Sequence, residues 1–161
     1  MISASDTPRS AAARLTAAFR SSGRYSVVFY LQALHEGRLT PYTAAKIERD
    51  AEQILDAQRR IAASKAKIAY GTDCGMFPFS HGNLEFQAMV KAGLDPARVL
   101  RAATGTVAEL LGRSDIGVLA PGAFADIVAM PGDPITDIAT TTTVDFVMIA
   151  GLLKRQPQPG L

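Results

Sequence analysis

The segment Lys67–Gly93 carries the side chains of this chain that are best suited to chemistry. A short apolar stretch, Lys67–Gly71, leads to Asp73, and a glycine-flanked loop then carries His81 before a helix that opens with Glu85. A carboxylate that follows a buried strand is costly unless a metal, a cation or a substrate meets it. In barrels and doubly wound folds, ligands bind where the strands end. Asp73 is therefore the first candidate for a functional residue.

Four further residues are candidates for function, and each also has a simpler structural interpretation. They are His81, Glu85, Cys74 and His35. His81 either contacts a substrate or is a solvent-exposed loop histidine. Glu85 falls in a first helical turn, where a carboxylate interacts favourably with the helix dipole without any function. Cys74 has no neighbouring base and no second cysteine nearby, so packing is favoured over catalysis. For His35, after the first apolar stretch, we expect a structural or exposed role.

Composition bounds the class of protein. The chain has 161 residues, of which 48% are apolar and 20% are charged, so it can bury a core. It is shorter than the roughly 200 to 250 residues that a complete α/β barrel needs. The net charge of +2 and the lack of a basic stripe argue against nucleic-acid binding.

The expected location is the cytoplasm. A single cysteine, Cys74, fits a reducing compartment. The sequence has no apolar run of membrane-spanning length and no secretory leader, so we expect neither membrane insertion nor secretion. The Arg, Ser and Ala bias of residues 1–20 is also found in organelle transit peptides, but it equally fits an ordinary helix or a frayed end.

The first half of the chain has the pattern of a βαβ unit. Residues Ser10–Phe19 are Ala-rich and predict a short helix, and the β-branched and aromatic stretch Tyr25–Leu31 predicts a buried strand. Thr40 before Pro41 is typical of a helix start, and apolar residues at helical spacing continue to about Ser64. With a second strand at Lys67–Gly71, we expect two parallel strands joined by a long helix.

Short helices and then short strands are expected in the second half. The helices are predicted over Asn83–Ala92, from the Asp95–Pro96 cap to Thr104, and over Thr106–Leu111, with Gly93 and Gly112 as stop signals. After Gly112 the sequence predicts strands joined by turns, at Ile116–Leu119, Ala125–Met130 and Val144–Arg155.

Taken in order, these features resemble the amidohydrolase superfamily, in its imidazolonepropionase-like and Xaa-Pro dipeptidase-like branch. The resemblance covers Lys67 to about Arg155 well and the preceding helix more loosely. It rests on the order and spacing of GTD at Gly71–Asp73, HGN at His81–Asn83 with Glu85, AG at Ala92–Gly93, AAT at Ala102–Thr104, AELLG at Ala108–Gly112, IGVLAPGAFADIV at Ile116–Val128, GDP at Gly132–Pro134 and FVMIAG at Phe146–Gly151.

The fold that this resemblance implies is α/β: the C-terminal part of a metal-dependent hydrolase (β/α)8 barrel, about two βα units, plus part of a small β-sandwich. Tyr25–Leu31 and Lys67–Gly71 would be barrel strands seven and eight. The corresponding division of the chain is a partial barrel segment at 1–112, a partial sandwich segment at 113–155 and a flexible tail at 156–161.

By the same resemblance, the reaction is metal-dependent hydrolysis of a C–N bond in a cyclic amide, a dipeptide or an N-acyl amino acid. Asp73 would be a metal ligand and would accept a proton during catalysis, and His81 would bind a small-molecule amide or peptide substrate. The resemblance implies a divalent metal as cofactor, and zinc is the metal that we expect.

Family members also carry an HxH pair, a carboxylated Lys or Glu, and further His ligands, whereas this chain has only His35 and His81. We therefore expect the isolated chain to lack a complete active site. The alternative function is a truncated or split, non-catalytic fragment that needs a complementing chain, or further copies of itself, to complete the barrel. A third reading is an α/β binding module without enzymatic history.

Overall fold

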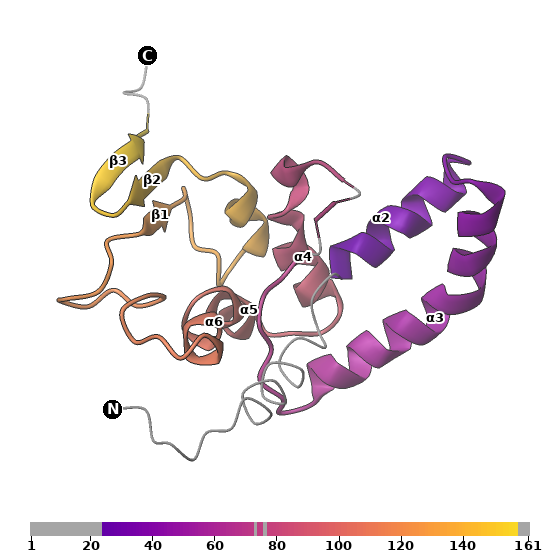
Figure 1. Ribbon diagram of the computed structural model, residues 1–161, viewed down its shortest axis with the longest axis horizontal. Coiled ribbons are helices and arrows are strands. Elements are labelled where there is room, and N and C mark those ends of the chain that lie inside the picture. Colours follow the sequence, from indigo (N-terminus) through magenta and orange to yellow (C-terminus); the bar gives the residue numbers. More distant parts are fainter. Residues whose placement is uncertain (1–23, 73, 76, 158–161) are drawn as a thin grey trace.

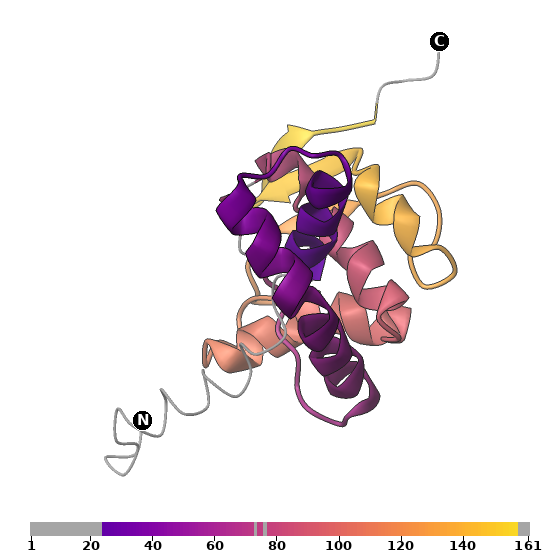
Figure 2. The ribbon, with the colours of Figure 1, turned by 90° about the vertical axis from the view of Figure 1, so that its right-hand side faces the viewer.

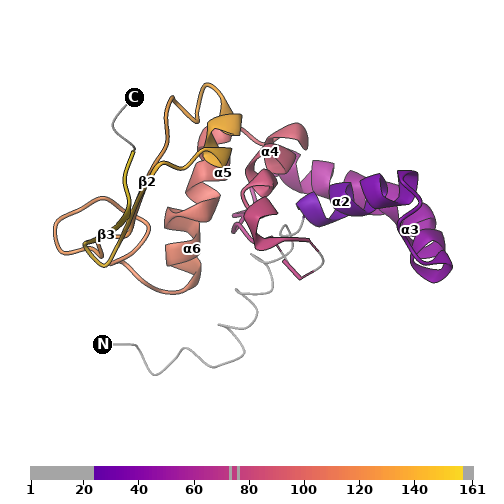
Figure 3. The same ribbon diagram turned by 90° about the horizontal axis from the view of Figure 1, so that it is seen from above.

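The computed structural model describes residues 24–72, 74–75 and 77–157. The elements form an elongated row (Figures 1 and 3), with the helical hairpin of α2 and α3 at one end, α4, α5 and α6 in the middle and a small sheet at the other end. Figure 2 looks along this row from the hairpin end. The elements are α2 (Arg24–His35), α3 (Pro41–Ala63), η2 (Phe79–His81), α4 (Leu84–Lys91), α5 (Pro96–Ala103), α6 (Gly105–Leu110), β1 (Ile127–Ala129), η3 (Ile138–Thr142), β2 (Phe146–Ile149) and β3 (Leu152–Arg155).

The long helix α3 confirms the sequence prediction. Its N-cap is Thr40, whose hydroxyl accepts a hydrogen bond from the Thr43 amide, and Pro41 occupies the first turn. The helix ends at Ser64, whose amide and hydroxyl both donate to the Ile61 carbonyl. Side-chain oxygens thus satisfy backbone groups that a helix end leaves without helical partners.

The predicted strand at Tyr25–Leu31 is wrong, because these residues lie within helix α2, which packs against α3 and α4. Lys67–Gly71 is extended, but in the described residues it joins no sheet; its Tyr70 amide donates to the Ala102 carbonyl on α5. A strand needs a neighbouring strand for its backbone groups, whereas a helix satisfies its own. The parallel βαβ unit is therefore not formed in the part of the chain that the structure describes.

The helices predicted after residue 80 are confirmed as α4, α5 and α6, each within one or two residues of its predicted bounds. The Asp95 carboxylate caps α5 by accepting from the Arg98 amide. The same Arg98 donates from its guanidinium to the carbonyls of Ala62 and Ala66, 2.8 and 2.7 Å away, and so covers the C-terminal end of α3. Cationic donors are favourable at that end of a helix.

The main core lies between these helices and the extended segment. Val99 is completely buried, and Met89 and Ala102 are 1% exposed. Ile68 and Ala69, from the extended segment, are also buried, which explains why that segment is apolar even though it pairs with no strand. The buried cluster comprises Ala62, Ile68, Met89, Leu94, Val99 and Ala102.

The sheet is antiparallel, in the order β1-β2-β3. The β2–β3 hairpin turns at Ala150 and Gly151, both at positive φ (50° and 77°), and Asp126 accepts a hydrogen bond from the Ala150 amide at 2.7 Å. Such a turn matches the twist of the strands it joins. The predicted strands within 125–130 and 144–155 are therefore confirmed, with shorter bounds.

The strand predicted at Ile116–Leu119 is wrong, because these residues form a bend that runs beside α6. Gly117 decides the conformation of this bend. It has φ +70°, and a Cβ built on it would lie 2.7 Å from the carbonyl carbon and oxygen of Thr104. The backbone thus approaches the start of α6 more closely than any L side chain permits.

Two predictions from the sequence are not tested by these elements. The helix predicted at Ser10–Phe19 lies outside the described residues. The division at residues 112 and 155 stays a prediction. In the part of the chain that the structure describes, no helix combines the length and the apolar character needed to cross a bilayer.

Candidate functional site

The candidate site is the segment from Tyr70 to Glu85, which leaves the core, forms a loop and returns into α4. Asp73 itself lies outside the described residues. On its N-terminal side, the Thr72 carbonyl accepts a hydrogen bond from the Ser26 hydroxyl of α2 at 3.1 Å. This bond fixes the chain to α2 at the position next to Asp73.

The loop returns to the residue that precedes Asp73. A Cβ built on Gly82 would lie 3.7 Å from the Thr72 side-chain methyl group, within van der Waals contact. Gly82 follows His81 directly, so the backbone next to each candidate residue is brought to the same place. The chain on the N-terminal side of Asp73 and the turn that carries His81 therefore lie close together, and the roles of these two side chains stay predictions.

His81 ends the short helix η2, and its side chain is half-buried. Its amide donates to the Pro78 carbonyl at 2.9 Å, and the amide of Gly82 donates to the Phe79 carbonyl at 2.9 Å. These bonds form a tight turn of backbone. His81 is thus partly exposed within this turn, and both interpretations, a substrate contact and a solvent-exposed loop histidine, stay predictions.

Glu85 lies in the first turn of α4, as predicted, but its exposed fraction is 0%. A surface carboxylate placed only to suit the helix dipole would remain in contact with water. A buried carboxylate is costly unless neighbouring groups stabilise it. Sequence reasoning placed Glu85 on the right element and missed its burial, because the first turn of a short helix gives no signal of what covers it.

Tyr70 is the residue of this site that sequence reasoning assigned only to a strand. Its hydroxyl donates to the Gly82 carbonyl at 2.6 Å. Burial raises the pKa of its phenol well above the ordinary value, and the negative charge of nearby Glu85 raises this pKa further. Tyr70 therefore keeps its proton, and its donor role, at neutral pH.

Asn83 fixes the far side of the loop. Its side-chain amide donates to the carbonyl of Thr141 at 3.3 Å, and Thr141 is 3% exposed within η3. The helix η3 also packs against α4. Three consecutive residues of this loop thus have different parts: His81 is the candidate residue, Gly82 lies close to Thr72, and Asn83 binds a segment almost 60 residues away in the sequence.

The remaining two candidates match their simpler interpretations. Cys74 is half-buried, and its thiol lies 3.4 Å from the carbonyl oxygen of Phe77. His35 is exposed in the last turn of α2. Both observations agree with structural or surface roles.

The residues present do not make up a metal site by themselves. Among the described residues, no group of three or more His, Cys, Asp or Glu side chains is placed to hold a metal ion. A catalytic zinc ion usually has three protein ligands and an open position. Asp73, which lies outside the described residues, could supply one such ligand.

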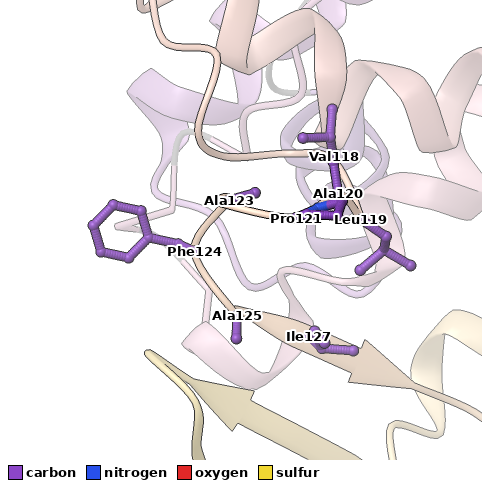
Figure 4. Close-up of a pocket in the computed structure, with 8 residues that line it drawn as sticks. All are labelled: Val118, Leu119, Ala120, Pro121, Ala123, Phe124, Ala125 and Ile127. Atoms are coloured by element: carbon purple, nitrogen blue, oxygen red, sulfur yellow. The ribbon is translucent and has the colours of Figure 1, made fainter.

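A hollow of about 280 Å³ lies elsewhere, between the bend at 118–125 and strand β1 (Figure 4). In Figure 4 the Phe124 ring points outward, away from the other labelled side chains, and the Arg113 guanidinium carbon lies over this ring, 5.2 Å from its centroid. The side chains that line the hollow are all apolar, so they offer no group for catalysis. The lining residues are Val118, Leu119, Ala120, Pro121, Ala123, Phe124, Ala125 and Ile127.

Comparison with known proteins now decides the family. The sequence model of the Amidohydrolase family matches residues 23–153. This chain belongs to the amidohydrolase family. The resemblance stated from the sequence motifs is therefore confirmed.

Curated amidohydrolase relatives match only with part of their length. Imidazolonepropionase from Deinococcus deserti is 37% identical over 86 residues, which are 52% of this chain and 22% of the relative. Adenine deaminase 1 from Carboxydothermus hydrogenoformans is 30% identical over 107 residues, 66% of this chain and 17% of the relative. The chain thus spans about a fifth of the length of these two relatives.

Solved structures of amidohydrolases show the same partial match. A Xaa-Pro dipeptidase with bound methionine superposes with a TM-score of 0.76 at 30% identity, over 82% of this chain and 33% of that chain. Ochratoxinase from A. niger superposes with a TM-score of 0.70 at 28% identity, over 85% of this chain and 32% of that chain. The chain is thus a fragment of the amidohydrolase fold: helices with a small three-stranded antiparallel sheet.

Proposed function

We propose that this chain is the C-terminal part of a metal-dependent hydrolase that cleaves a C–N bond in a cyclic amide, a dipeptide or an N-acyl amino acid. The observation that carries the proposal is the superposition with the Xaa-Pro dipeptidase over 82% of this chain, at 30% identity and a TM-score of 0.76. The imidazolonepropionase matches add support for a cyclic amide as an alternative substrate.

In this proposal Asp73 supplies one carboxylate ligand and acts as the proton acceptor, and His81 contacts the substrate. Amidohydrolases generally depend on a metal, and we propose zinc as the metal here. The described residues do not form a complete site for it. The remaining ligands would come from the part of the fold that this chain does not contain. We also propose a cytoplasmic location, since the single cysteine fits a reducing compartment.

The proposal can be tested with a chimera, in which residues 24–157 replace the corresponding segment of the Xaa-Pro dipeptidase. We expect hydrolysis of Xaa-Pro dipeptides that Asp73→Asn lowers by about 100-fold or more, the usual size of an acid–base contribution. Asp145→Asn is the matched control, because Asp145 lies in the loop before β2 and has no proposed role. An Asp73→Asn chimera that keeps full activity would contradict the assignment.

The isolated chain gives the complementary result. With zinc, manganese or cobalt added, we expect no turnover of dipeptides or N-acyl amino acids. Metal-dependent turnover that Asp73→Ala abolishes would instead require a site assembled from several copies of this chain.

The second candidate function is that of a non-catalytic fragment that completes a barrel with another chain. One observation favours it: an apolar sheet face, which we define as Val128, Val147, Ile149 and Leu152. Val128 pairs with Val147 and Ile149 with Leu152, so the four side chains project to one side. Val128, Ile149 and Leu152 are 58%, 51% and 63% exposed.

An antiparallel sheet with one face in water normally shows polar side chains there. We therefore propose that a complementing chain, which carries the missing strands of the fold, covers the apolar sheet face. Without it, the wild-type chain should bind a hydrophobic dye or self-associate in light scattering, and replacing Ile149 and Leu152 by Thr should reduce both signals. Lys154→Thr on the same strand is the control. A monomeric wild-type chain without dye binding would contradict this function.

A further inference from the structure

Tyr70 is held at three separate points, although its segment joins no sheet among the described residues. Its backbone amide donates to the Ala102 carbonyl at 2.9 Å. Its ring packs against Phe86 of α4, with the ring centroids 4.4 Å apart and the planes tilted by 32°. Its hydroxyl reaches the Gly82 carbonyl at 2.6 Å. The core therefore holds both ends of this side chain.

The carbonyl that Tyr70 binds belongs to the turn that carries His81. The Gly82 oxygen also accepts the amide of Glu85 at 3.2 Å, so two donors hold one carbonyl. On the other side, Asn83 is bound to the Thr141 carbonyl. The turn that carries His81 is thus tied to the core on one side and to η3 on the other.

Packing alone does not explain a tyrosine here. A phenylalanine would keep the ring contact with Phe86, and the hydroxyl would be costly to bury without its acceptor. A tyrosine hydroxyl is protonated at neutral pH, and the raised pKa of Tyr70 extends this donor state to higher pH. The hydroxyl therefore does something that the ring does not.

We propose that Tyr70 is a positioning residue that holds the His81 turn against the segment leading to Asp73. Tyr70 precedes Asp73 by three residues in the sequence, and Gly82 directly follows His81, so the bond from Tyr70 to Gly82 ties the chain before Asp73 to the turn that carries His81. The inference rests on the proposed function only for the role of His81 in the site. The tether itself involves neither a metal nor a substrate.

The test uses the whole chain and its two histidines, His35 and His81. Ring signals of both histidines are followed by NMR in the wild type and in Tyr70→Phe under the same conditions. We expect the His81 signals to shift or broaden in Tyr70→Phe. The His35 signals, on the exposed end of α2, should stay unchanged and so report the general state of the protein.

The variant Phe86→Leu distinguishes positioning by the Tyr70 hydroxyl from a merely structural role of the Tyr70 ring. It removes the ring partner of Tyr70 and keeps the hydroxyl. We expect this variant to lose stability with the His81 signals in place. Unchanged His81 signals in Tyr70→Phe, or equal changes in both variants, would overturn the proposal. In the wild type, nuclear Overhauser contacts from the Tyr70 ring to the Gly82 turn are expected, and their absence would also overturn it, even where Tyr70→Phe does not fold. Loss of the tether would leave the hydrolase proposal standing, since none of these measurements uses activity.

Discussion

Gly117 offers a quantitative test of how the sheet segment is joined to the helices. Gly117→Ala places a methyl group 2.7 Å from the Thr104 carbonyl group and forces alanine to φ +70°. The left-handed conformation costs an alanine about 1–2 kcal/mol. Overpacking against rigid backbone adds about 1–3 kcal/mol. We therefore expect a loss of about 2–5 kcal/mol, a large part of the roughly 5–15 kcal/mol of a whole domain.

Gly122→Ala is a matched control in the same loop region. Gly122 has φ +86°, and a Cβ built on it meets nothing within 4 Å, so only the conformational cost of about 1–2 kcal/mol applies. The difference between the two variants isolates the close approach to Thr104. Urea unfolding followed by circular dichroism gives both free energies, and hydrogen exchange of the α6 amides locates the damage. Equal losses in the two variants would refute the reasoning, because they would mean that Gly117 does not contact the start of α6 in solution.

Three further results are expected. Ala150→Gly should raise the unfolding free energy by up to about 1 kcal/mol, since it removes an alanine from φ 50° in the hairpin turn; a lower urea midpoint would be inconsistent with that turn. Arg98→Ala should cost about 1–2 kcal/mol, because the carbonyl of Ala62 in the last turn of α3 and that of Ala66 just after the helix lose their charged donor, and Arg98→Lys should recover part of the loss in the same unfolding assay. The pKa of Asp133 is lowered, mainly by the hydrogen bond from the Ile135 amide, so this bond should be present at neutral pH and lost as the pH falls through the lowered pKa. The Ile135 amide signal should follow that titration by NMR and stop doing so in Asp133→Asn.

The sequence alone determined where several helices of this protein begin and end, because short-range signals mark those positions. Thr40 with Pro41 and Asp95 with Pro96 mark the starts of α3 and α5, because a capping oxygen and a proline act on backbone groups only a few residues away. Gly93 and Gly112 both have positive φ after the helices that they end. The order of motifs also identified the family, because each of those motifs is a local pattern.

Only the tertiary structure decided the state of Tyr25–Leu31 and Lys67–Gly71. Their composition favours strands, but a strand is stable only beside another strand, and in the described residues neither segment has one. The burial of Glu85 and the bond from Tyr70 to Gly82 likewise depend on groups that meet in space: the loop folds back on the extended segment, and α4 packs on both. Spacing in the sequence predicts which residues are close along the chain, whereas burial and the second partner of a hydrogen bond are set by how the elements pack.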